Sequence, residues 1–316
     1  MRIAVYLPML TAALLAATAP WLARRLPPAT ATWLLVLAGV GVAASTTLTL
    51  ILLAWTVVIE SPAVAALGSW SPSAWDIRNP VPDAVAVLSL ITLIAVLCSL
   101  AGTMTRLARR SAGVREVLGG PGGDDRDDVV VVDHNGIEAF AVAYPRGRGR
   151  IVISTGMLHL LTEPERRALI AHEHAHLRHR HHRHRAVTAA ASALNPLLWP
   201  LRRAVEFATE RWADEQAVLA VGDRPLVAQA LARAALARRG PLHFPAAMSY
   251  DQLNVPERVR HLLQPRPHPR PLLTVAIVTV LVLTLAAAGD ASEDTGHLLD
   301  QAGASSFTAR APTLGR

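Results

Sequence analysis

The sequence His172-Glu173-His174-Ala175-His176 is the most informative stretch of this chain. Residues four apart in an α-helix lie on one face, so the imidazoles of His172 and His176 can reach the same metal ion. The carboxylate of Glu173 then projects beside that ion, where it can accept a proton from bound water. The pattern therefore predicts a helix that carries two metal ligands and a general base.

The residues around this motif favour a helix. Thr162 and Glu165 have the spacing of a capping box, and Pro164 lies in the first turn. Residues 166–185 contain neither Gly nor Pro, so we expect one continuous helix through the motif.

A simpler interpretation of the same stretch stays open at this point. Seven of the thirteen residues from 172 to 184 are histidine, and arginines are interspersed among them. Such a composition also suits a solvated helix face or a loose metal-binding tract. A third ligand is needed to choose between these interpretations.

A second candidate helix covers residues 206–214 and carries Glu210 and Asp214 on one face. A catalytic zinc site has three protein ligands and an open position for water, and Glu210 can complete a His-His-Glu set. Asp214 can hydrogen-bond the distal nitrogen of a ligand histidine. Glu206 is a weaker candidate for the third ligand. His179 is a rival, because it lies seven residues after the first histidine of the motif and returns to the same helix face.

These motifs resemble those of gluzincin membrane peptidases, in which HExxH is followed by ExxxD, including the CaaX prenyl protease and its bacterial heat-shock relatives. The fuller resemblance is to the antirepressor metallopeptidases that signal beta-lactam exposure in bacteria, and it covers roughly residues 1–290. It also rests on three short matches: Ala139-Phe140-Ala141, the Ile-Val-Ile-Ser-Thr-Gly sequence of residues 151–156, and Asn195-Pro196.

The resemblance implies that one Zn²⁺ per chain is held by His172, His176 and Glu210. It implies that Glu173 is the general base and that Asp214 orients a ligand. His174 stands where that family has varied residues, and the histidine-rich continuation to residue 184 is no part of its motif.

Four uncharged stretches are long enough to cross a bilayer core, which takes about 20 residues. In this chain 52% of residues are hydrophobic but only 4% are aromatic. The first stretch could instead be a cleaved signal peptide, since Ala17-Thr18-Ala19 suits a cleavage site, but Pro20 and the following arginine pair favour a retained span. The stretches are residues 3–23, 31–59, 84–105 and 271–289.

The arginines predict how these spans are oriented. Basic clusters follow the first and third spans and precede the fourth, whereas the loop 60–83 holds one arginine and acidic residues follow the fourth span. Cytoplasmic loops carry the excess of basic residues, so we expect both termini outside and residues 106–270 in the cytoplasm of a bacterial plasma membrane. The net charge of +7 arises mostly in this way, and direct nucleic-acid binding is not expected.

The cytoplasmic part should begin after a glycine-rich linker at 119–123 and an acidic run at 124–128. Residues 129–132 predict a strand, Asn135-Gly136 a hairpin turn, and 137–143 the return strand. Residues 151–154 predict a third strand. Ala139-Phe140-Ala141 would be an exposed edge that binds a peptide substrate by strand addition, although a core strand is as good an interpretation.

Three shorter segments complete this part. Residues 186–200 are apolar but interrupted by prolines, so we expect an interfacial or re-entrant segment. Residues 226–239 and 255–263 predict two further helices. Cys98 is the lone cysteine, so the chain cannot form an internal disulfide.

The sequence thus predicts a membrane α-helical protein of four transmembrane helices with an α+β zincin-like metallopeptidase domain. Its divisions are residues 1–118 (three spans), 124–270 (the peptidase domain), 271–289 (the fourth span) and 290–316 (a short tail outside). A metal transporter would need polar ligands inside the spans, which carry no charge and no histidine. A catalytically inactive zinc scaffold is the other alternative.

The expected activity is hydrolysis of peptide bonds in a cytoplasmic or membrane-proximal protein. The resemblance suggests a transcriptional repressor as substrate, in signal transduction. In the resembled family a penicillin-binding sensor domain follows the last span, whereas only a short polar tail stands there in this sequence. General quality control of membrane proteins is the alternative role.

Overall fold

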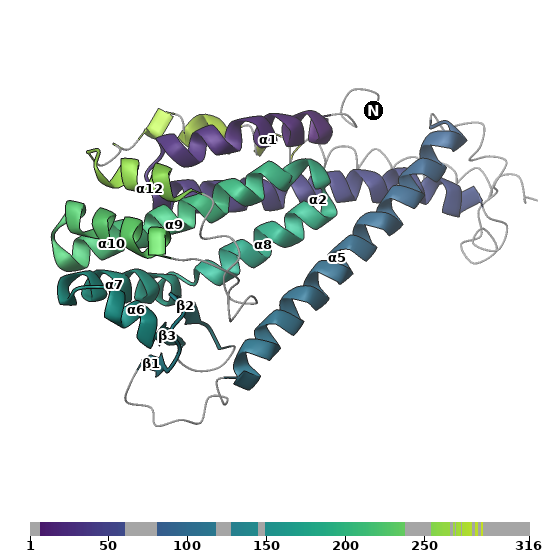
Figure 1. The fold of residues 1–316 in the computed structure, drawn as a ribbon. Coiled ribbons are helices and arrows are strands. Elements are labelled where there is room, and N and C mark those ends of the chain that lie inside the picture. Colours follow the sequence, from purple (N-terminus) through teal and green to yellow (C-terminus); the bar gives the residue numbers. More distant parts are fainter. Residues whose placement is uncertain are drawn as a thin grey trace, which may run out of the picture.

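The computed structural model describes residues 7–60, 81–117, 128–144, 149–237 and 254–265, with scattered positions between 268 and 286. Figure 1 shows long helices that run side by side and, at one end of them, a group of shorter helices with a small sheet. Most of the predicted loop 60–83, the glycine-rich linker, almost all of the acidic run, the tail and part of the fourth span lie outside the described residues.

Three long helices come first in the chain. α1 spans Leu7–Arg25, α2 spans Pro28–Glu60 and α5 spans Asp83–Val117. Leucines and alanines of α1 and α2 are buried in one apolar core. α2 and α5 are each long and apolar enough to cross a membrane. α2 is mostly buried, whereas α5 exposes large apolar side chains such as Leu88, Ile91 and Ile94.

A helical hairpin packs against these long helices. α8 (His181–Leu194) leads through a short 3-10 helix, η3 (Pro196–Leu198), into α9 (Trp199–Val221). Asn195 at the tip accepts a hydrogen bond from the Leu197 amide, and its Nδ2 donates to Thr46 Oγ1 of α2 at 3.2 Å. The segment predicted as interfacial or re-entrant is therefore the end of a helical hairpin that lies along α2 (Figure 1).

The sheet has a different topology from the predicted one. β1 (Val129–Val132) pairs in parallel with β3 (Arg150–Ser154), and β2 (Ala139–Val142) pairs antiparallel with β3, which gives the order β1-β3-β2. The predicted hairpin of β1 with β2 around Asn135-Gly136 is wrong, because β3 lies between these two strands.

The residues between β1 and β2 cross the end of β3 instead of turning back. The Gly156 amide donates to the His134 carbonyl at 3.0 Å, and the Ser154 amide donates to the Glu138 carbonyl at 3.0 Å. A Cβ atom on Gly156 would lie 2.3 Å from the carbonyl oxygen of Asn135. Glycine is thus required where the crossing segment meets the beginning of the next helix.

Two helices follow the sheet, α6 (Thr155–Leu160) and α7 (Glu163–Arg178). The capping box is confirmed, since the amide and hydroxyl of Thr162 both donate to Glu165 Oε2 at 2.8 Å. The expected continuous helix is wrong. It ends at Arg178, and Arg180 takes the left-handed conformation with φ of 52° before α8 begins. That conformation costs a non-glycine residue about 1–2 kcal/mol, which the packing of α8 against α2, α5 and α9 offsets.

The remaining described helices are α10 (Arg224–Ala237) and α12 (Val255–Leu262), close to the two predicted ranges. Two ion pairs fix α10 in place. Arg224 donates two hydrogen bonds of 2.8 Å to the carboxylate of Glu215 on α9, and Arg233 lies 3.0 Å from Glu165 at the start of α7. α7, α9, α10 and α12 therefore surround one small region.

Candidate metal centre

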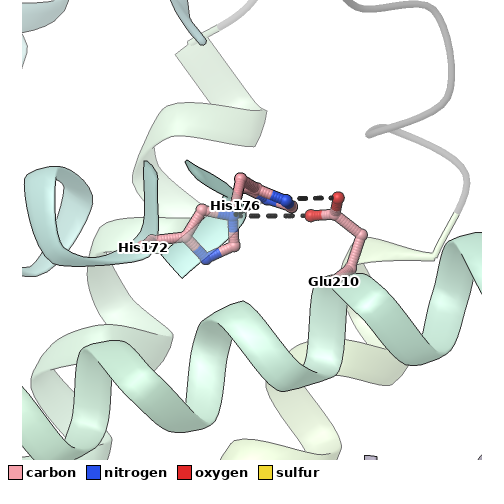
Figure 2. A group of neighbouring side chains, drawn as sticks. All are labelled: His172, His176 and Glu210. Carbon is pink, nitrogen blue, oxygen red and sulfur yellow. Dashed lines mark hydrogen bonds and ion pairs between the residues drawn. The ribbon is translucent and has the colours of Figure 1, made fainter. Parts of the chain in front are cut away.

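Three side chains from two helices meet in this region. His172 and His176 project from successive turns of α7, and Glu210 projects toward them from α9 (Figure 2). The Nε2 atoms of the two histidines are 3.1 Å apart. One carboxylate oxygen of Glu210 lies 3.5 Å from His172 Nε2, and the other lies 3.5 Å from His176 Nε2.

The triangle of His172, His176 and Glu210 is close to the size that a zinc ion requires. Zinc is bound tetrahedrally with donors at about 2.0–2.1 Å, which separates the donor atoms by roughly 3.3 Å. The two Nε2 atoms are 3.1 Å apart and each lies 3.5 Å from a different oxygen of Glu210; with one ligand atom taken from each residue, all three lie within 4.8 Å of one another. Two imidazoles and one carboxylate are also a common donor set of catalytic zinc sites. These three residues could therefore hold one metal ion.

Glu173, the predicted general base, lies beside the triangle. It is buried, at 6% exposure, and with His172 it lines a cavity of about 60 Å³ between α7 and α10. A buried carboxylate beside the candidate ligands is suited to take up and return a proton.

Asp214 and Arg258 form the layer behind His172. Asp214 Oδ1 lies 3.1 Å from His172 Nδ1, which fixes the ring with its Nε2 toward the triangle. Arg258 of α12 binds the same carboxylate in a bidentate manner, with hydrogen bonds of 2.8 and 2.7 Å. Its Nη1 also lies 3.1 Å from Glu210 Oε2. A single guanidinium thus contacts both acidic residues of the ExxxD motif.

The other side of the triangle has its own supporting contacts. Arg185 of α8 donates hydrogen bonds to Glu210 Oε1 and to the hydroxyl of Thr209. The Nδ1 atoms of His181 and His176 are 2.9 Å apart, so one ring donates to the other. Each of the three candidate ligands therefore has a partner that orients it.

The charges around the site set its protonation. Burial alone would raise the pKa of Glu210, but the charges of Arg258, His176 and Arg185 lower it well below its usual range. Burial lowers the pKa of His176 well below its ordinary value. For His172 burial acts in the same direction, but hydrogen bonds to Asp214 and Glu210 outweigh it and raise the pKa to about 10. A metal ion at this site must therefore displace a proton from His172.

The weaker ligand candidates lie elsewhere. Glu206 makes an ion pair of 3.0 Å with Arg202 on its own helix. His179 is the C-cap residue that follows α7, and its ring stacks on Trp212 at 4.4 Å between centroids. Because the helix ends before His179, this residue does not continue the face that carries the two ligand histidines.

The predicted substrate strand lies close to the metal centre. β2 is one edge of the three-stranded sheet, and its Ala139 lines the same cavity as Glu173. Phe140 is buried, while Ala141 is partly exposed. A role of Ala139, Phe140 and Ala141 in substrate binding remains a prediction.

A second and larger cavity reaches the centre from the long helices. It has a volume of about 450 Å³ and lies between α1 and α9, with Pro20, Trp199 and Arg203 in its lining. Glu210 and Arg258 also line it. The metal centre is thus approached from the side of α1 as well as from the side of α10.

The sequence did not predict a role at this site for Arg258, Arg185 or His181. Arg258 had one usable signal. Val255, Val259 and Leu262 form the apolar stripe of α12, and Arg258 falls on that stripe rather than opposite it. An arginine on an apolar stripe indicates a buried partner. Arg185 and His181 had no such signal, because they stand among many similar residues.

Comparison with known families identifies the class of protein to which this centre is similar. Residues 105–239 match the model of Peptidase family M48, and this segment contains all three candidate ligands and Glu173. Comparison with curated proteins and with solved structures finds no match. The family match supports a metallopeptidase function, and thus a hydrolase. The resemblance to the antirepressor type in particular stays a prediction.

Proposed function

We propose that this protein is a membrane-embedded zinc metalloendopeptidase that hydrolyses a cytoplasmic or membrane-proximal protein. The observation that carries the proposal is the triangle of His172, His176 and Glu210 with Glu173 beside it. The match of this segment to Peptidase family M48 supports the same conclusion.

The protein's residues divide the chemistry among them. His172, His176 and Glu210 would hold Zn²⁺, which supplies an acidified water and polarises the scissile carbonyl. Glu173 takes the proton of the attacking water and delivers it to the nitrogen of the leaving amine. Asp214 keeps His172 in the required tautomer and orientation, and Arg258 keeps Asp214 in place.

Zinc content tests the ligand set. We expect one zinc per chain in the detergent-purified protein, with most of it lost in Glu210→Gln. Glu206→Gln is the matched control, one turn earlier on the same helix, and should keep its zinc. Zinc that survives Glu210→Gln but is lost when His179, His182 and His184 are replaced would support the alternative of a histidine tract and contradict the proposal.

A second experiment separates catalysis from metal binding. Glu173→Gln should keep its zinc but lose about 10²–10⁴-fold in peptide hydrolysis, because the general base is gone. Glu163→Gln changes an exposed glutamate at the start of the same helix and should leave the rate unchanged. Full hydrolysis by Glu173→Gln would remove this residue from the mechanism.

We place the metal centre at the cytoplasmic surface of the membrane. Two helices, α2 and α5, are long and apolar enough to cross a bilayer. We propose that α1 and residues 271–289 also cross it, since the arginine distribution then places all basic clusters on one side. His184, near the start of α8, contacts Trp33 near the start of α2. The eleven residues from His184 to Asn195 rise roughly 16 Å along the axis of α8, which is about half the thickness of a bilayer core.

Cysteine labelling tests this orientation. Arg178→Cys in a Cys98→Ala background puts one thiol at an exposed end of α7. A membrane-impermeant maleimide should label it in inverted membrane vesicles and not in intact cells. Labelling in intact cells would reverse the proposed topology.

The physiological substrate is proposed from chemistry and resemblance together. The cavity between α1 and α9 supports a substrate that approaches close to the membrane. Cleavage of a transcriptional repressor is the proposed role. A proteome survey of a Glu173→Gln strain tests it: one accumulating repressor supports signalling, and many damaged membrane proteins would support quality control instead.

A further inference from the structure

We infer that the cavity between α1 and α9 holds the phosphate of an anionic phospholipid, with Arg203 as its main partner. This site adds a membrane ligand to the proposed function. The inference rests on the membrane placement proposed above and does not depend on peptide hydrolysis.

One face of α9 forms a wall of this cavity. Trp199, Arg203, Glu206 and Glu210 all line it and recur every three or four residues, so they follow one another along the helix. α1 lies beside α9 (Figure 1) and supplies a second wall. Arg203 precedes Glu210 by seven residues, which is roughly 10 Å along the helix axis. An anion held at Arg203 therefore leaves the candidate metal ligand free.

Arg203 is the charged residue of the lining that lacks an oppositely charged partner. It makes no hydrogen bond or ion pair within the part of the chain that the structure describes, and its guanidinium lies over the ring of Trp199, 3.8 Å from the centroid. Every other charged side chain of the lining is paired. These pairs are Arg24 with Glu257, Glu206 with Arg202, and Arg258 with both Asp214 and Glu210. The cavity thus carries one positive charge that no described carboxylate balances.

The surroundings of Arg203 suit a segment inside the membrane. Leu197 and Trp199, just before it in the chain, are apolar and expose about half of their surface. In the proposed placement the α8–α9 hairpin enters the bilayer up to its tip at Asn195, so Arg203 lies deeper than Glu210. A charge at that depth is costly unless it is paired or reaches the phosphates of the lipids. A lipid phosphate is the counter-ion that the membrane itself provides.

A second guanidinium lines the same cavity from α1. Arg24 binds Glu257 through its Nε and Nη2 atoms, at 2.5 and 3.3 Å, and its Nη1 makes no hydrogen bond to a described residue. Guanidinium groups bind phosphate through paired N–H···O bonds, and basic pockets between transmembrane helices on the cytoplasmic side bind anionic headgroups. Arg24 and Arg203 together therefore suit one phosphate that bridges α1 and α9.

The size and the edge of the cavity also suit a lipid. Its volume of about 450 Å³ falls within the roughly 300–1,000 Å³ of small-molecule sites, so it can hold a headgroup. Trp199 and the nearby Leu197 expose apolar surface against which acyl chains can pack. An acidic peptide would balance the charge of Arg203 but would leave this apolar surface uncovered.

The test is lipid binding by the full-length zinc-loaded protein, stripped of lipid in detergent and titrated with phosphatidylglycerol or phosphatidylcholine under native mass spectrometry. We expect phosphatidylglycerol, with its net negative charge, to bind at least about tenfold more tightly than phosphatidylcholine. Arg203→Gln should reduce the affinity for phosphatidylglycerol about tenfold, because one charge-assisted pair is lost. Glu206→Gln removes a carboxylate from the lining and releases Arg202, so it should increase this affinity.

Arg183→Gln is the matched control, since it makes the same change at an exposed arginine near the start of α8, outside the cavity lining. Its affinity should equal that of the unchanged protein. Zinc content and a thermal melt verify that each variant folds, and Glu206→Gln decides if Arg203→Gln does not.

Two competitors identify the source of the anion. Soluble glycerol 3-phosphate, at the same concentration as the lipid, should leave bound phosphatidylglycerol in place. Displacement by it would show that phosphate alone is the ligand and would overturn the lipid. Displacement by a glutamate-rich peptide at that concentration would assign Arg203 to the binding of a peptide and would overturn the lipid as well.

The failures of the two proposals differ. Equal affinity for the two lipids, or equal affinity of Arg203→Gln and Arg183→Gln for phosphatidylglycerol, would overturn the lipid site and leave the peptidase intact. Glu173→Gln should bind phosphatidylglycerol as the unchanged protein does, because Glu173 does not line this cavity. A protein that binds the lipid as expected but hydrolyses no peptide would overturn the proposed function alone.

Discussion

The two halves of α9 face two different kinds of interior. Its first half, with Leu201, Val205 and Ala208, is buried among aliphatic side chains of α1 and α2. Its second half buries Glu210, Arg211 and Asp214, all charged. The first interior contains hydroxyl groups such as Thr32 and Ser45, which bond to carbonyls one turn earlier on the same helix. In the second, each charge is paired with a residue from another part of the chain.

The two interiors therefore respond differently to a substitution. In the charged interior the partners come from α1, α7, α8 and α12, so one substitution leaves a buried charge without its counterpart. Such a loss typically costs several kcal/mol. In the apolar interior the fit is one of shape, and a substitution costs what the lost or excess volume costs.

Arg258→Gln should have the largest effect, because Asp214 loses its bidentate partner and Glu210 loses one of its two guanidinium partners. We expect the free energy of unfolding in detergent micelles to fall by about 3–5 kcal/mol. Glu257→Gln is the neighbouring control. Its pair with Arg24, whose side chain is 49% exposed, should contribute no more than about 1 kcal/mol. Equal losses in the two variants would mean that the charged interior is no more interdependent than the surface.

Gly39→Val probes the apolar interior. A Cβ on Gly39 would lie 2.4 Å from a methyl group of Leu201, which is fully buried and cannot move aside freely. The cost should be about 1–3 kcal/mol in the same unfolding measurement. Gly102→Val on α5 is the control, with no atom within 4 Å of the added Cβ. A larger loss at Gly102 would contradict the exposed placement of α5.

Proton release on zinc binding tests how the charged interior controls the protonation of His172. The pKa of His172, raised to about 10, keeps this ring protonated at pH 8 until a metal binds. Zinc binding should then release about one proton from it, measurable by calorimetry in buffers of different ionisation enthalpy. Asp214→Asn removes a charge that raises the pKa of His172. A smaller fraction of His172 is then protonated at pH 8, and zinc binding should release fewer protons. Protons released by groups other than His172 are the same in both proteins. An equal release from the two proteins would therefore refute the coupling between His172 and Asp214.

Thr46→Val should have the smallest effect. It removes the hydroxyl that accepts a hydrogen bond from Asn195 at the tip of the α8–α9 hairpin. One neutral hydrogen bond contributes about 1 kcal/mol. Thr92→Val on α5 is the control, since that hydroxyl bonds only to the Leu88 carbonyl of its own helix among the described residues. A loss of several kcal/mol at Thr46 would show that the apolar interior depends on this contact.

The sequence was sufficient for what depends on local spacing. The helical periodicity placed His172 with His176, and Glu210 with Asp214, and the Val-rich and Ile-rich runs located the strands. The strand pairing could not be obtained this way. Asn135-Gly136 is a strong local hairpin signal, but the crossing segment is held by Ser154 and Gly156, about twenty residues later.

The break between α7 and α8 could not be predicted from the sequence either. Arg180 adopts a left-handed conformation without the Gly or Asn that usually indicates one, because tertiary packing determines it. Arg258 lies 48 residues after Glu210 in the chain, and no local rule connects them. The candidate metal ligands were therefore predictable, while the groups that orient them mostly were not.

Arg211 has a consequence for the order of events during synthesis. Next to Glu210, it donates to carbonyl groups of Ala23 and Leu26 at the end of α1. The ribosome makes that helix end first, the histidines of α7 much later, and Arg258 later still. The surroundings of Glu210 are thus complete only when α12 has been translated and α1 is already in place. A nascent chain that has made all of the HExxH and ExxxD residues therefore still lacks the Arg258 guanidinium that contacts Glu210 and Asp214.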